Sequence, residues 1–283
     1  MKWFSFLGVM LTLLISCTLT LTFNIHLAEA TQTIYIRADG SVDPSTAPIR
    51  NIGNVSYTFT SNINESIVVE RDNIVIDGAC YTLQGLGSGR GIDLTGRSNI
   101  TIKSIKVAQF YYGIYLEGSS NITLLGNTVT TCEWDGVFLS NSVNNVLYDN
   151  IFSSNKRYGT MLSQSGNNRI FHNSFVCNVL NQTRLFESFN NIWDDSYPSG
   201  GNYWSDYKGT DLFHGPLQNE TGGDDIGDTA YVIDEYNTDN YPLMMPWEKN
   251  PPLTSHDYYG SWQTADFTIN LTAVDDLSGV AET

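Results

Sequence analysis

Seven residues near the middle of the chain could bind a sugar. Aromatic rings offer flat apolar faces that suit the C–H faces of sugar rings, and polar neighbours can hold hydroxyl groups. The residues recur at equivalent places of a repeating pattern: Tyr111, Tyr112, Tyr115, Trp134, Asp135, Phe138 and Tyr158. Their spacing predicts a surface strip that binds carbohydrate. The alternative is that a loop or a terminal segment covers the same rings.

An acidic, glycine-rich run could bind calcium. Residues 222–228 read GGDDIGD, and carboxylate oxygens are the ligands that Ca²⁺ prefers. The candidate ligands are Asp224, Asp225 and Asp228. The run lacks the spacing of the EF-hand loop and of tandem nonapeptide calcium repeats, and Asx turns explain the same composition. Both interpretations stay open at this point.

Carboxylates beside a base could also cleave a polysaccharide. Glycoside hydrolysis uses two carboxyl groups, and lysine or arginine can serve as a base when a proton is removed. The candidate acids on the repeats are Asp93, Glu117, Asp135 and Asp149, and Lys156-Arg157 is the basic pair beside them. The four acids do not share one position of the repeat. No residue is therefore assigned a catalytic role.

The repeat that positions these residues has a period of 22 or 23. Segments beginning with NIT or NN start at Asn99, Asn121, Asn144, Asn167 and Asn190, with a looser copy at Asn73. A unit this short cannot enclose a core, so each unit must bury its apolar face against the next. The spacing predicts one turn of a parallel β-solenoid per repeat. The expected fold class is all-β.

Within the aligned repeats, apolar residues recur in columns that we expect to face inward, because alternate residues of a strand share one face. The columns are Ile92, Ile114, Val137, Thr160; Leu94, Leu116, Leu139, Leu162; Ile102, Leu124, Leu147, Ile170; and Val107, Val129, Phe152, Phe175. Glycines recur just before the first column, where a tight corner or a positive φ favours them: Gly113, Gly136 and Gly159. A polar stack of amides is predicted at Asn127, Asn150 and Asn173.

The two ends of the chain differ from the repeats. Residues 1–30 have the form of a signal peptide, with an A-x-A site at 28–30. The alternatives are lipid attachment at Cys17 and an uncleaved membrane anchor. We expect an N-terminal cap over 31–72, β-helix repeats over 73–195, a C-terminal cap rich in glycine, aspartate and aromatic residues over 196–250, and a linker with the truncated start of an immunoglobulin-like β-sandwich over 251–283.

The charge is distributed unevenly. The net charge is −16, with 12 acidic and 11 basic residues over 31–189 against 17 acidic and 2 basic residues over 190–283. This balance disfavours a nucleic-acid partner. It is typical of solubility in a salty or extracellular medium, and also of divalent-cation binding. No segment after the first thirty residues is long and apolar enough to span a bilayer.

Other features agree with an extracellular chain. Seven sequons are compatible with glycosylation: Asn54, Asn64, Asn99, Asn121, Asn181, Asn219 and Asn270. Cys132 and Cys177 lie about two repeats apart, and two turns of roughly 4.8 Å each exceed the reach of a disulfide. We expect both cysteines to be small buried apolar residues.

The repeats NITIKSIKVAQFYYGIYLEGSS and NITLLGNTVTTCEWDGVFLSNSV resemble right-handed parallel β-helix proteins of the NosD type, within the wider group of carbohydrate-binding and sugar-hydrolase repeats. The segment 190–246 looks like the cap of many secreted archaeal β-helix proteins. The resemblance covers roughly 31–250. It implies a β-helix, and it implies carbohydrate binding, polysaccharide cleavage or copper maturation as functions.

We expect a secreted or cell-surface protein that binds polysaccharide or is displayed on it. The expected role is structural or adhesive, without catalysis. The first alternative is a polysaccharide lyase or glycoside hydrolase. The second is a NosD-like copper maturation factor, which is disfavoured because copper sites need clustered His, Cys or Met and here His172, His214 and His256 are scattered. The expected partner is a surface glycan, and calcium is the one cofactor that the composition raises.

Overall fold

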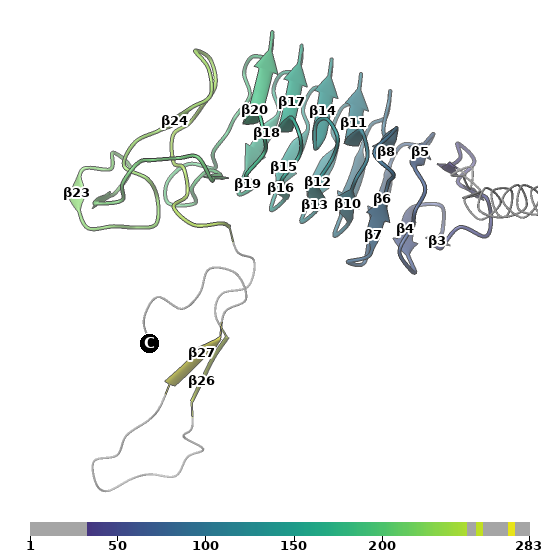
Figure 1. Cartoon of the computed structure of the whole chain (residues 1–283), viewed down its shortest axis with the longest axis horizontal. Helices are drawn as coiled ribbons and strands as arrows, with labels where there is room; N and C mark the ends of the chain where they lie inside the picture. The colour runs from purple at the N-terminus through teal and green to yellow at the C-terminus, as the bar shows by residue number, and fades with distance from the viewer. Residues whose placement is uncertain (1–32, 248–252, 257–270, 275–283) are drawn as a thin grey trace, which may run out of the picture. The chain divides into compact units, whose positions relative to one another are not determined.

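The computed structural model describes residues 33–247, 253–256 and 271–274. Over these residues the chain is all-β, without a helix, and forms a right-handed parallel β-solenoid of about six turns. Successive turns, here called rungs, stack side by side from β5 to β20 (Figure 1). The predicted fold class is confirmed. The predicted signal peptide lies outside the described residues.

Three sheets run along the solenoid, and each rung contributes one strand to each. The first sheet contains β2 (Val42–Asp43), β1 (Ile34–Ile36), β5 (Ile67–Val69), β8 (Arg90–Asp93), β11 (Tyr112–Glu117), β14 (Val137–Ser140), β17 (Tyr158–Ser163) and β20 (Asn181–Phe186). The second contains β18 (Arg169–Phe171), β15 (Val146–Tyr148), β12 (Thr123–Leu125), β9 (Ile100–Lys103), β6 (Ile74–Asp77), β4 (Ser56–Phe59) and β3 (Ile49–Ile52). The third contains β21 (Tyr203–Trp204), β19 (Ser174–Val176), β16 (Ile151–Ser153), β13 (Thr128–Thr130), β10 (Lys106–Ala108) and β7 (Thr82–Gln84).

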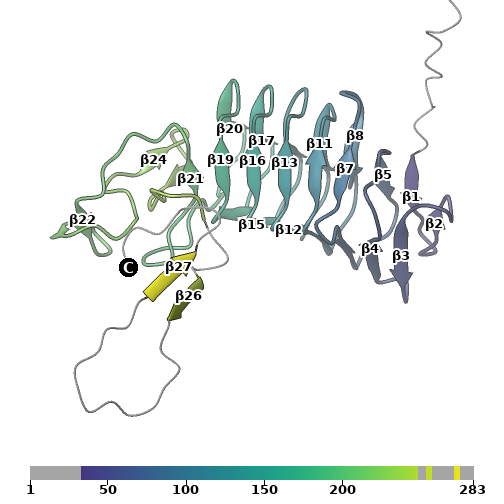
Figure 2. The same ribbon diagram turned by 60° about the horizontal axis from the view of Figure 1, so that its bottom comes forward.

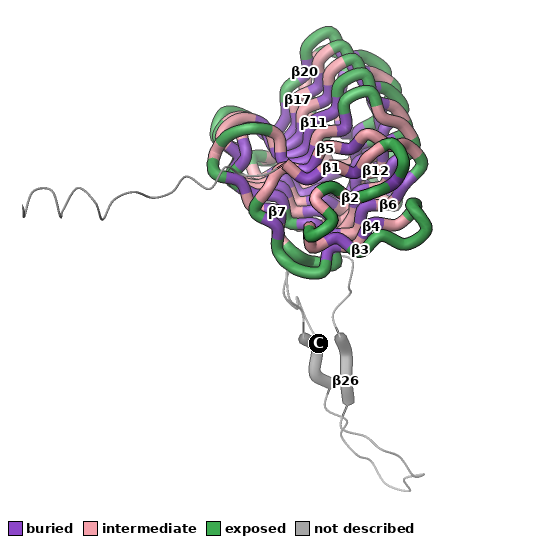
Figure 3. Tube along the Cα trace, turned by 90° about the vertical axis from the view of Figure 1, so that its right-hand side faces the viewer, coloured by how far each residue is buried: buried purple, intermediate pink, exposed green. Residues whose placement is uncertain are grey.

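The four predicted columns form the core. Every member from Ile92 to Phe175 has zero exposure, and strand register places equivalent residues of neighbouring rungs directly opposite each other. The view along the solenoid shows that buried positions run along the stacked strands, while exposed positions lie mainly at the turns (Figure 3). Trp204 continues the last column, because it pairs with Phe175 in register and its ring stacks on that ring at 4.4 Å. The inward assignment is confirmed.

The recurring glycines are not explained by a positive φ, which was one of the two predicted reasons for them. Gly113, Gly136 and Gly159 do not have positive φ; instead, the next rung leaves no room for a side chain. A Cβ atom at Gly136 would lie 2.6 Å from the carbonyl oxygen of Gly159 and 2.7 Å from the Asn155 amide. The left-handed positions include the asparagines that open each repeat: Asn73, Asn99, Asn121, Asn144, Asn167 and Asn190, with φ between 54° and 60°. Asparagine tolerates this conformation better than most residues.

Buried amides connect the rungs at their corners. The backbone N–H of Asn127 donates to the Asn150 side-chain oxygen at 2.9 Å, and Asn150 in turn donates to Asn173 at 3.0 Å. Each Nδ2 also donates back to a carbonyl of the preceding rung, as Asn150 does to Leu124 at 2.9 Å. The predicted stack is thus a ladder that satisfies both donors and acceptors. A second amide ladder follows Asn145, Asn168 and Asn191.

Residues 193–247, here called the C-terminal segment, contain only two-residue strands. They include the antiparallel pairs β22 (Phe213–His214) with β23 (Glu220–Thr221), and β24 (Tyr231–Val232) with β25 (Thr238–Asp239). Figure 2 shows this segment beyond the last rung. Farther on, β26 (Leu253–His256) pairs with β27 (Leu271–Val274). The immunoglobulin-like module falls mostly outside the described residues, and its identity, like that of the two caps, stays a prediction.

The cysteines follow the prediction only in part. Cys80, Cys132 and Cys177 are free, and Cys132 is fully buried. Cys177 is exposed, so the expectation that it is a buried residue is wrong. Its equivalents in the two preceding rungs, Thr131 and Ser154, are also exposed and share its left-handed backbone conformation. This corner position therefore points to solvent in every rung.

Candidate functional site

The predicted aromatic residues gather on the outer face of the first sheet. Tyr115 of β11 pairs in register with Phe138 of β14, and their rings stack with centroids 5.2 Å apart. At the corner that leads into these strands, the rings of Tyr111 and Trp134 stack at 5.2 Å and are nearly parallel. Strand alternation explains the first pair, because each lies between two inward residues of its strand.

Tyr112 joins these two stacked pairs into one surface. Its ring lies 5.2 Å from the rings of both Tyr115 and Phe138, and it meets Tyr111 edge to face at 4.9 Å. The five rings, which come from only two neighbouring rungs, are here called the aromatic strip. All are partly exposed except Tyr115, which keeps 8% of its surface accessible.

Two arginines lie over the strip. The Arg90 guanidinium lies 3.4 Å from the centre of the Tyr115 ring and also pairs with Asp93 at 2.6 Å. This contact explains the low exposure of Tyr115. The Arg157 guanidinium lies 4.4 Å from the Trp134 ring and 4.8 Å from the Tyr158 ring. Tyr158 therefore joins the site through Arg157 rather than through another ring.

Asp135 does not occupy the surface position that a sugar-binding carboxylate would need. It has zero exposure, and neither carboxylate oxygen accepts a well-formed hydrogen bond from a described residue, although the backbone N–H of Tyr158 lies close enough to lower its pKa. Its closest charged neighbour is the Arg157 guanidinium, 3.9 Å away. Burial raises the pKa of Asp135 to about 7, although Arg157 opposes the shift. The prediction of an outward polar group is wrong here, because the large side chains in register with it, Tyr112 and Tyr158, enclose it.

Sequence reasoning identified the five rings but missed the role of Arg90. The strand register would have indicated this role, because Arg90 pairs directly with Tyr112 across β8 and β11. A guanidinium one rung away from a tyrosine is within reach of neighbouring rings, because rungs are separated by about 4.8 Å. The repeat alignment of Arg90 with Tyr112 could therefore have indicated an arginine over the strip.

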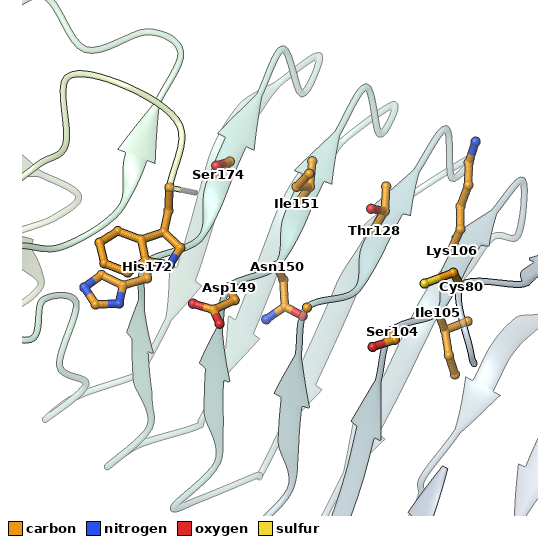
Figure 4. A pocket seen from close by; sticks show the side chains of 12 residues that line it. Cys80, Ser104, Ile105, Lys106, Thr128, Asp149, Asn150, Ile151, His172 and Ser174 are labelled. Carbon is orange, nitrogen blue, oxygen red and sulfur yellow. The ribbon is translucent and has the colours of Figure 1, made fainter. Parts of the chain in front are cut away.

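A second surface feature was not predicted from the sequence. An open groove of about 330 Å³ follows the corner between the second and third sheets (Figure 4). Its lining residues come from successive rungs: Cys80, Ser104, Ile105, Lys106, Gly126, Thr128, Asp149, Asn150, Ile151, His172, Ser174 and Trp247. The signal in the sequence was the recurrence of left-handed corner residues at Ser104, Gly126, Asp149 and His172. We call this feature the corner groove.

His172 at one end of the corner groove is held from two sides. Its ring stacks on Trp247 at 3.6 Å, and its Nε2 lies 2.9 Å from the Ser199 carbonyl oxygen. Burial lowers the pKa of His172, while the Ser199 carbonyl and Asp149 oppose that shift. The imidazole is thus a packed residue that fixes the last described part of the C-terminal segment.

The acidic run does not form a metal site in the part of the chain that the structure describes. The Asp228 carboxylate accepts backbone N–H groups of Leu212 and Phe213 at 3.0 Å, and Asp224 accepts the N–H of Ile226 at 3.2 Å. Asp225 donates its own N–H to Asp211 at 2.8 Å. Turn chemistry therefore accounts for these aspartates, and the described residues bring together no cluster of three or more metal-binding side chains.

The candidate acids for catalysis have different surroundings. Asp93 pairs with Arg90, Glu117 accepts the Tyr115 hydroxyl at 3.2 Å, Asp135 is buried, and Asp149 lines the corner groove. Asp93 and Glu117 both lie close enough to the Tyr115 hydroxyl to raise its pKa, and no catalytic pair is assigned among the four acids.

The family model described as "Periplasmic copper-binding protein (NosD)" matches residues 25–209, which is well over half of the chain. The chain belongs to the NosD family. No curated protein matches this NosD-family chain. Three crystal structures of the periplasmic alginate epimerase AlgG are similar, two of them of mutants. The first has 23% identity, a TM-score of 0.40 and a match covering 46% of this chain, and the third has 19% identity and a TM-score of 0.36. The NosD-family chain spans only about a third of the epimerase's length, 33% in the first case.

The family description raises copper, and the described residues of this NosD-family chain do not fit it. Copper sites are built from clustered His, Cys or Met. His172 is engaged by Ser199 and Trp247, and His214 lies 3.5 Å from Glu220. Burial raises the pKa of Cys132 to about 12, which disfavours the thiolate that binds metals. No step of the function is therefore derived through copper.

Among the described residues, none forms a helix that could cross a membrane.

Proposed function

We propose that the chain binds polysaccharide on the aromatic strip and does not cleave it. The observation that carries the proposal is the set of five contacting rings on an outer face, where a soluble protein normally places polar residues. Rings of two rungs form one surface, longer than a single sugar contact requires. An extended glycan lying along the solenoid would meet several rings at once.

The geometry of the strip suits sugar rings. The Tyr115–Phe138 and Tyr111–Trp134 pairs are stacked with nearly parallel planes, so each presents a flat apolar face of two rings. Tyrosine hydroxyls and the Arg90 and Arg157 guanidinium groups supply hydrogen-bonding partners at its margin.

The strip is not used for packing another part of the described chain. Among the described residues, every aromatic partner of the five rings belongs to the strip itself. This supports an open face. The alternative from the sequence was that a loop or a terminal segment covers the rings.

A binding assay with a single substitution tests the proposal. Trp134→Ala removes the most extended ring and its stack with Tyr111, and should weaken retention in affinity gels cast with soluble polysaccharides by about tenfold. The matched control is Tyr148→Ala. It removes one ring of a stacked pair, Tyr148 and Phe171, which lies on the second sheet with Arg169 over it.

The two variants separate the proposal from its alternative. Loss of retention in Trp134→Ala with normal retention in Tyr148→Ala, both with unchanged circular dichroism, supports binding on the strip. Equal retention in wild type and Trp134→Ala across neutral and acidic polysaccharides would show that the strip is not a glycan site.

We also propose that this role is performed outside the cytoplasm. Six of the seven sequon asparagines lie in the described residues, and all six are exposed: Asn54, Asn64, Asn99, Asn121, Asn181 and Asn219. The family is described as periplasmic, which is compatible with this location. Amino-terminal sequencing of the mature protein should begin near Thr31, and a protein that retains Met1 would contradict processing.

A further inference from the structure

Arg157 differs from Arg90, Lys156 and Arg169 on the outer surface of the rungs. Its guanidinium lies 4.4 Å from the centre of the Trp134 ring, and among the described residues its closest carboxylate oxygen is 3.9 Å away. The Arg90, Lys156 and Arg169 side chains instead have carboxylate partners at 2.6 or 2.7 Å. A guanidinium stacked on a ring leaves its N–H edges directed away from that ring, where they can bind a carboxylate in a bidentate manner.

The carboxylate at 3.9 Å is Asp135, which is itself in an unusual position. It is fully buried under the strip, and its two oxygens accept no hydrogen bond among the described residues. The groups that face it are Tyr112 of the preceding rung, Arg157 and the backbone N–H of Tyr158 of the following rung, and Cys132 of its own loop. Glu133 and Lys156, which are also nearby, neutralise each other at 2.6 Å.

We propose that the strip selects glycans bearing carboxylate groups, with Arg157 binding the glycan carboxylate and Asp135 competing for the same guanidinium when it is ionised. The inference rests on the proposed function, since the sugar rings must lie on the aromatic strip. It adds the substrate class and a proton-dependent control of affinity.

The direction of the pH effect follows from the burial of Asp135. Burial raises the pKa of Asp135 to about 7, against Arg157, so the side chain is neutral in mild acid and charged in mild base. A charged Asp135 attracts the Arg157 guanidinium toward the protein and lowers its attraction for a second anion. Sugar carboxylates stay ionised over this range, because ordinary carboxyl groups titrate near pH 4. Affinity for an acidic glycan should therefore fall as pH rises from 6 to 8.

Isothermal titration calorimetry with two forms of one polymer tests the inference. Polygalacturonate carries a carboxylate on each sugar, and its fully methyl-esterified form has the same backbone without the charge. We expect wild type to bind polygalacturonate about tenfold more tightly than the ester at pH 6, and to lose much of that preference at pH 8. Arg157→Gln should abolish the preference at both pH values, and Asp135→Asn should keep it at both.

The outcomes separate the inference from the proposed function. Equal binding of the two polymers by wild type, with loss of both in Trp134→Ala, would overturn the acidic selectivity and leave the strip as a neutral-glycan site. A preference that survives in Arg157→Gln, or one whose pH dependence persists in Asp135→Asn, would overturn the assigned roles. Binding of neither polymer, together with no retention of any polysaccharide, would overturn the proposed function itself.

Discussion

The rungs, residues 73–192, and the C-terminal segment, residues 193–247, satisfy their polar groups in different ways. In the rungs, amide side chains bond from one rung to the next, as Asn127, Asn150 and Asn173 do. In the C-terminal segment, carboxylates accept backbone N–H groups, as Asp228 does from Leu212 and Phe213.

The amide ladder of the rungs ends on a carboxylate of the C-terminal segment. It continues from Asn173 to Asn202, whose backbone N–H then donates to the Asp239 carboxylate at 2.7 Å. The indole of Trp204 donates to the same oxygen at 2.8 Å. An amide both donates and accepts, so it suits a position with a rung on each side, whereas a carboxylate only accepts and suits the end of the series.

This difference explains the uneven charge of the chain. A repeat supplies the same donor and acceptor at every rung, and neutral amides are sufficient. A segment without repeats leaves isolated N–H groups, and aspartates satisfy them in turns and at chain crossings. Among the described residues after 190, several aspartates thus act as backbone acceptors, including Asp211, Asp228 and Asp239, and no cluster of three or more metal-binding side chains is found.

Substitution in the amide ladder should have the largest effect on stability. Asn150→Ala removes the acceptor of the Asn127 backbone and side-chain N–H groups, and it removes two Nδ2 protons that are shared among the Leu124 carbonyl, the Tyr148 carbonyl and the Asn173 side-chain oxygen. The Asn173 oxygen keeps the Asn150 backbone N–H, whereas the buried Asn127 N–H loses its partner. We expect the free energy of unfolding to fall by about 4 kcal/mol or more. Urea denaturation followed by circular dichroism measures it.

The control for Asn150 is Asn141, an asparagine that directly follows β14 of the same solenoid. Asn141→Gly changes an exposed residue with a φ of 46°, which glycine also adopts, so the change in free energy should stay below about 1 kcal/mol. Similar losses for both variants would mean that the ladder does not hold the rungs together.

Loss of the terminal carboxylate should affect the C-terminal segment alone. Asp239→Ala leaves the N–H groups of Asn202, Trp204 and Tyr241 without their acceptor, at a cost of about 3 kcal/mol. Hydrogen exchange should increase over residues 193–247 and stay unchanged in β11 to β16. Exposed Asp206 is the control, since Asp206→Ala removes only the acceptor of the Tyr231 hydroxyl. Faster exchange throughout the rungs in Asp239→Ala would show that the two regions are not separately stabilised.

Asp135 is the exception among the rungs, because it is a carboxylate without a donor. Its raised pKa means that the neutral form is favoured by folding, so its contribution is fully present below the unfolded-state pKa near 4 and is lost as pH rises from there through about 7. Relative to wild type, the free energy of unfolding of Asp135→Asn should therefore be higher by about 2 kcal/mol or more at pH 8 than at pH 5. Thermal denaturation at the two pH values measures the difference. A destabilised variant at pH 8 would mean that ionised Asp135 is compensated by Arg157.

The regularity of the rungs also decides how much the sequence could predict. The inward columns and the Asn127–Asn173 stack followed from the period alone, because each position has the same neighbours in every rung. The burial of Asp135 could not be predicted from the period, since it depends on the large side chains of Tyr112 and Tyr158 in the rungs on either side. The corner groove was missed for a similar reason: its concavity reflects small corner residues such as Ser104 and Gly126 beside larger ones. In the C-terminal segment no repeat exists, so pairings such as Asn202 with Asp239 had no signal.

Acid should loosen the loop of residues 210–228 before the rungs. Burial alone would raise the pKa of Asp228, but the N–H groups of Leu212 and Phe213 and the Thr210 hydroxyl outweigh it and hold that pKa below its ordinary value. A lowered pKa means that the stabilisation is present above the pKa of the unfolded chain and is lost as pH falls through the folded value. Amide ladders have no group that titrates in this range. Protection factors from hydrogen exchange over 210–228 should therefore fall between pH 5 and pH 2 while those of the rungs persist.

The Asp228→Asn variant isolates the carboxylate in this acid response. It retains an acceptor oxygen but cannot be protonated, so its loop should show weaker protection at pH 5 and almost no further loss on acidification. Because the Asp228 carboxylate contacts three donors of residues 210–213, the effect should be confined to that loop and be the smallest of the series. If the rungs lost protection at the same pH as the loop in the wild type, buried amides would have no advantage over carboxylates, and the contrast between the two regions would not describe their stability.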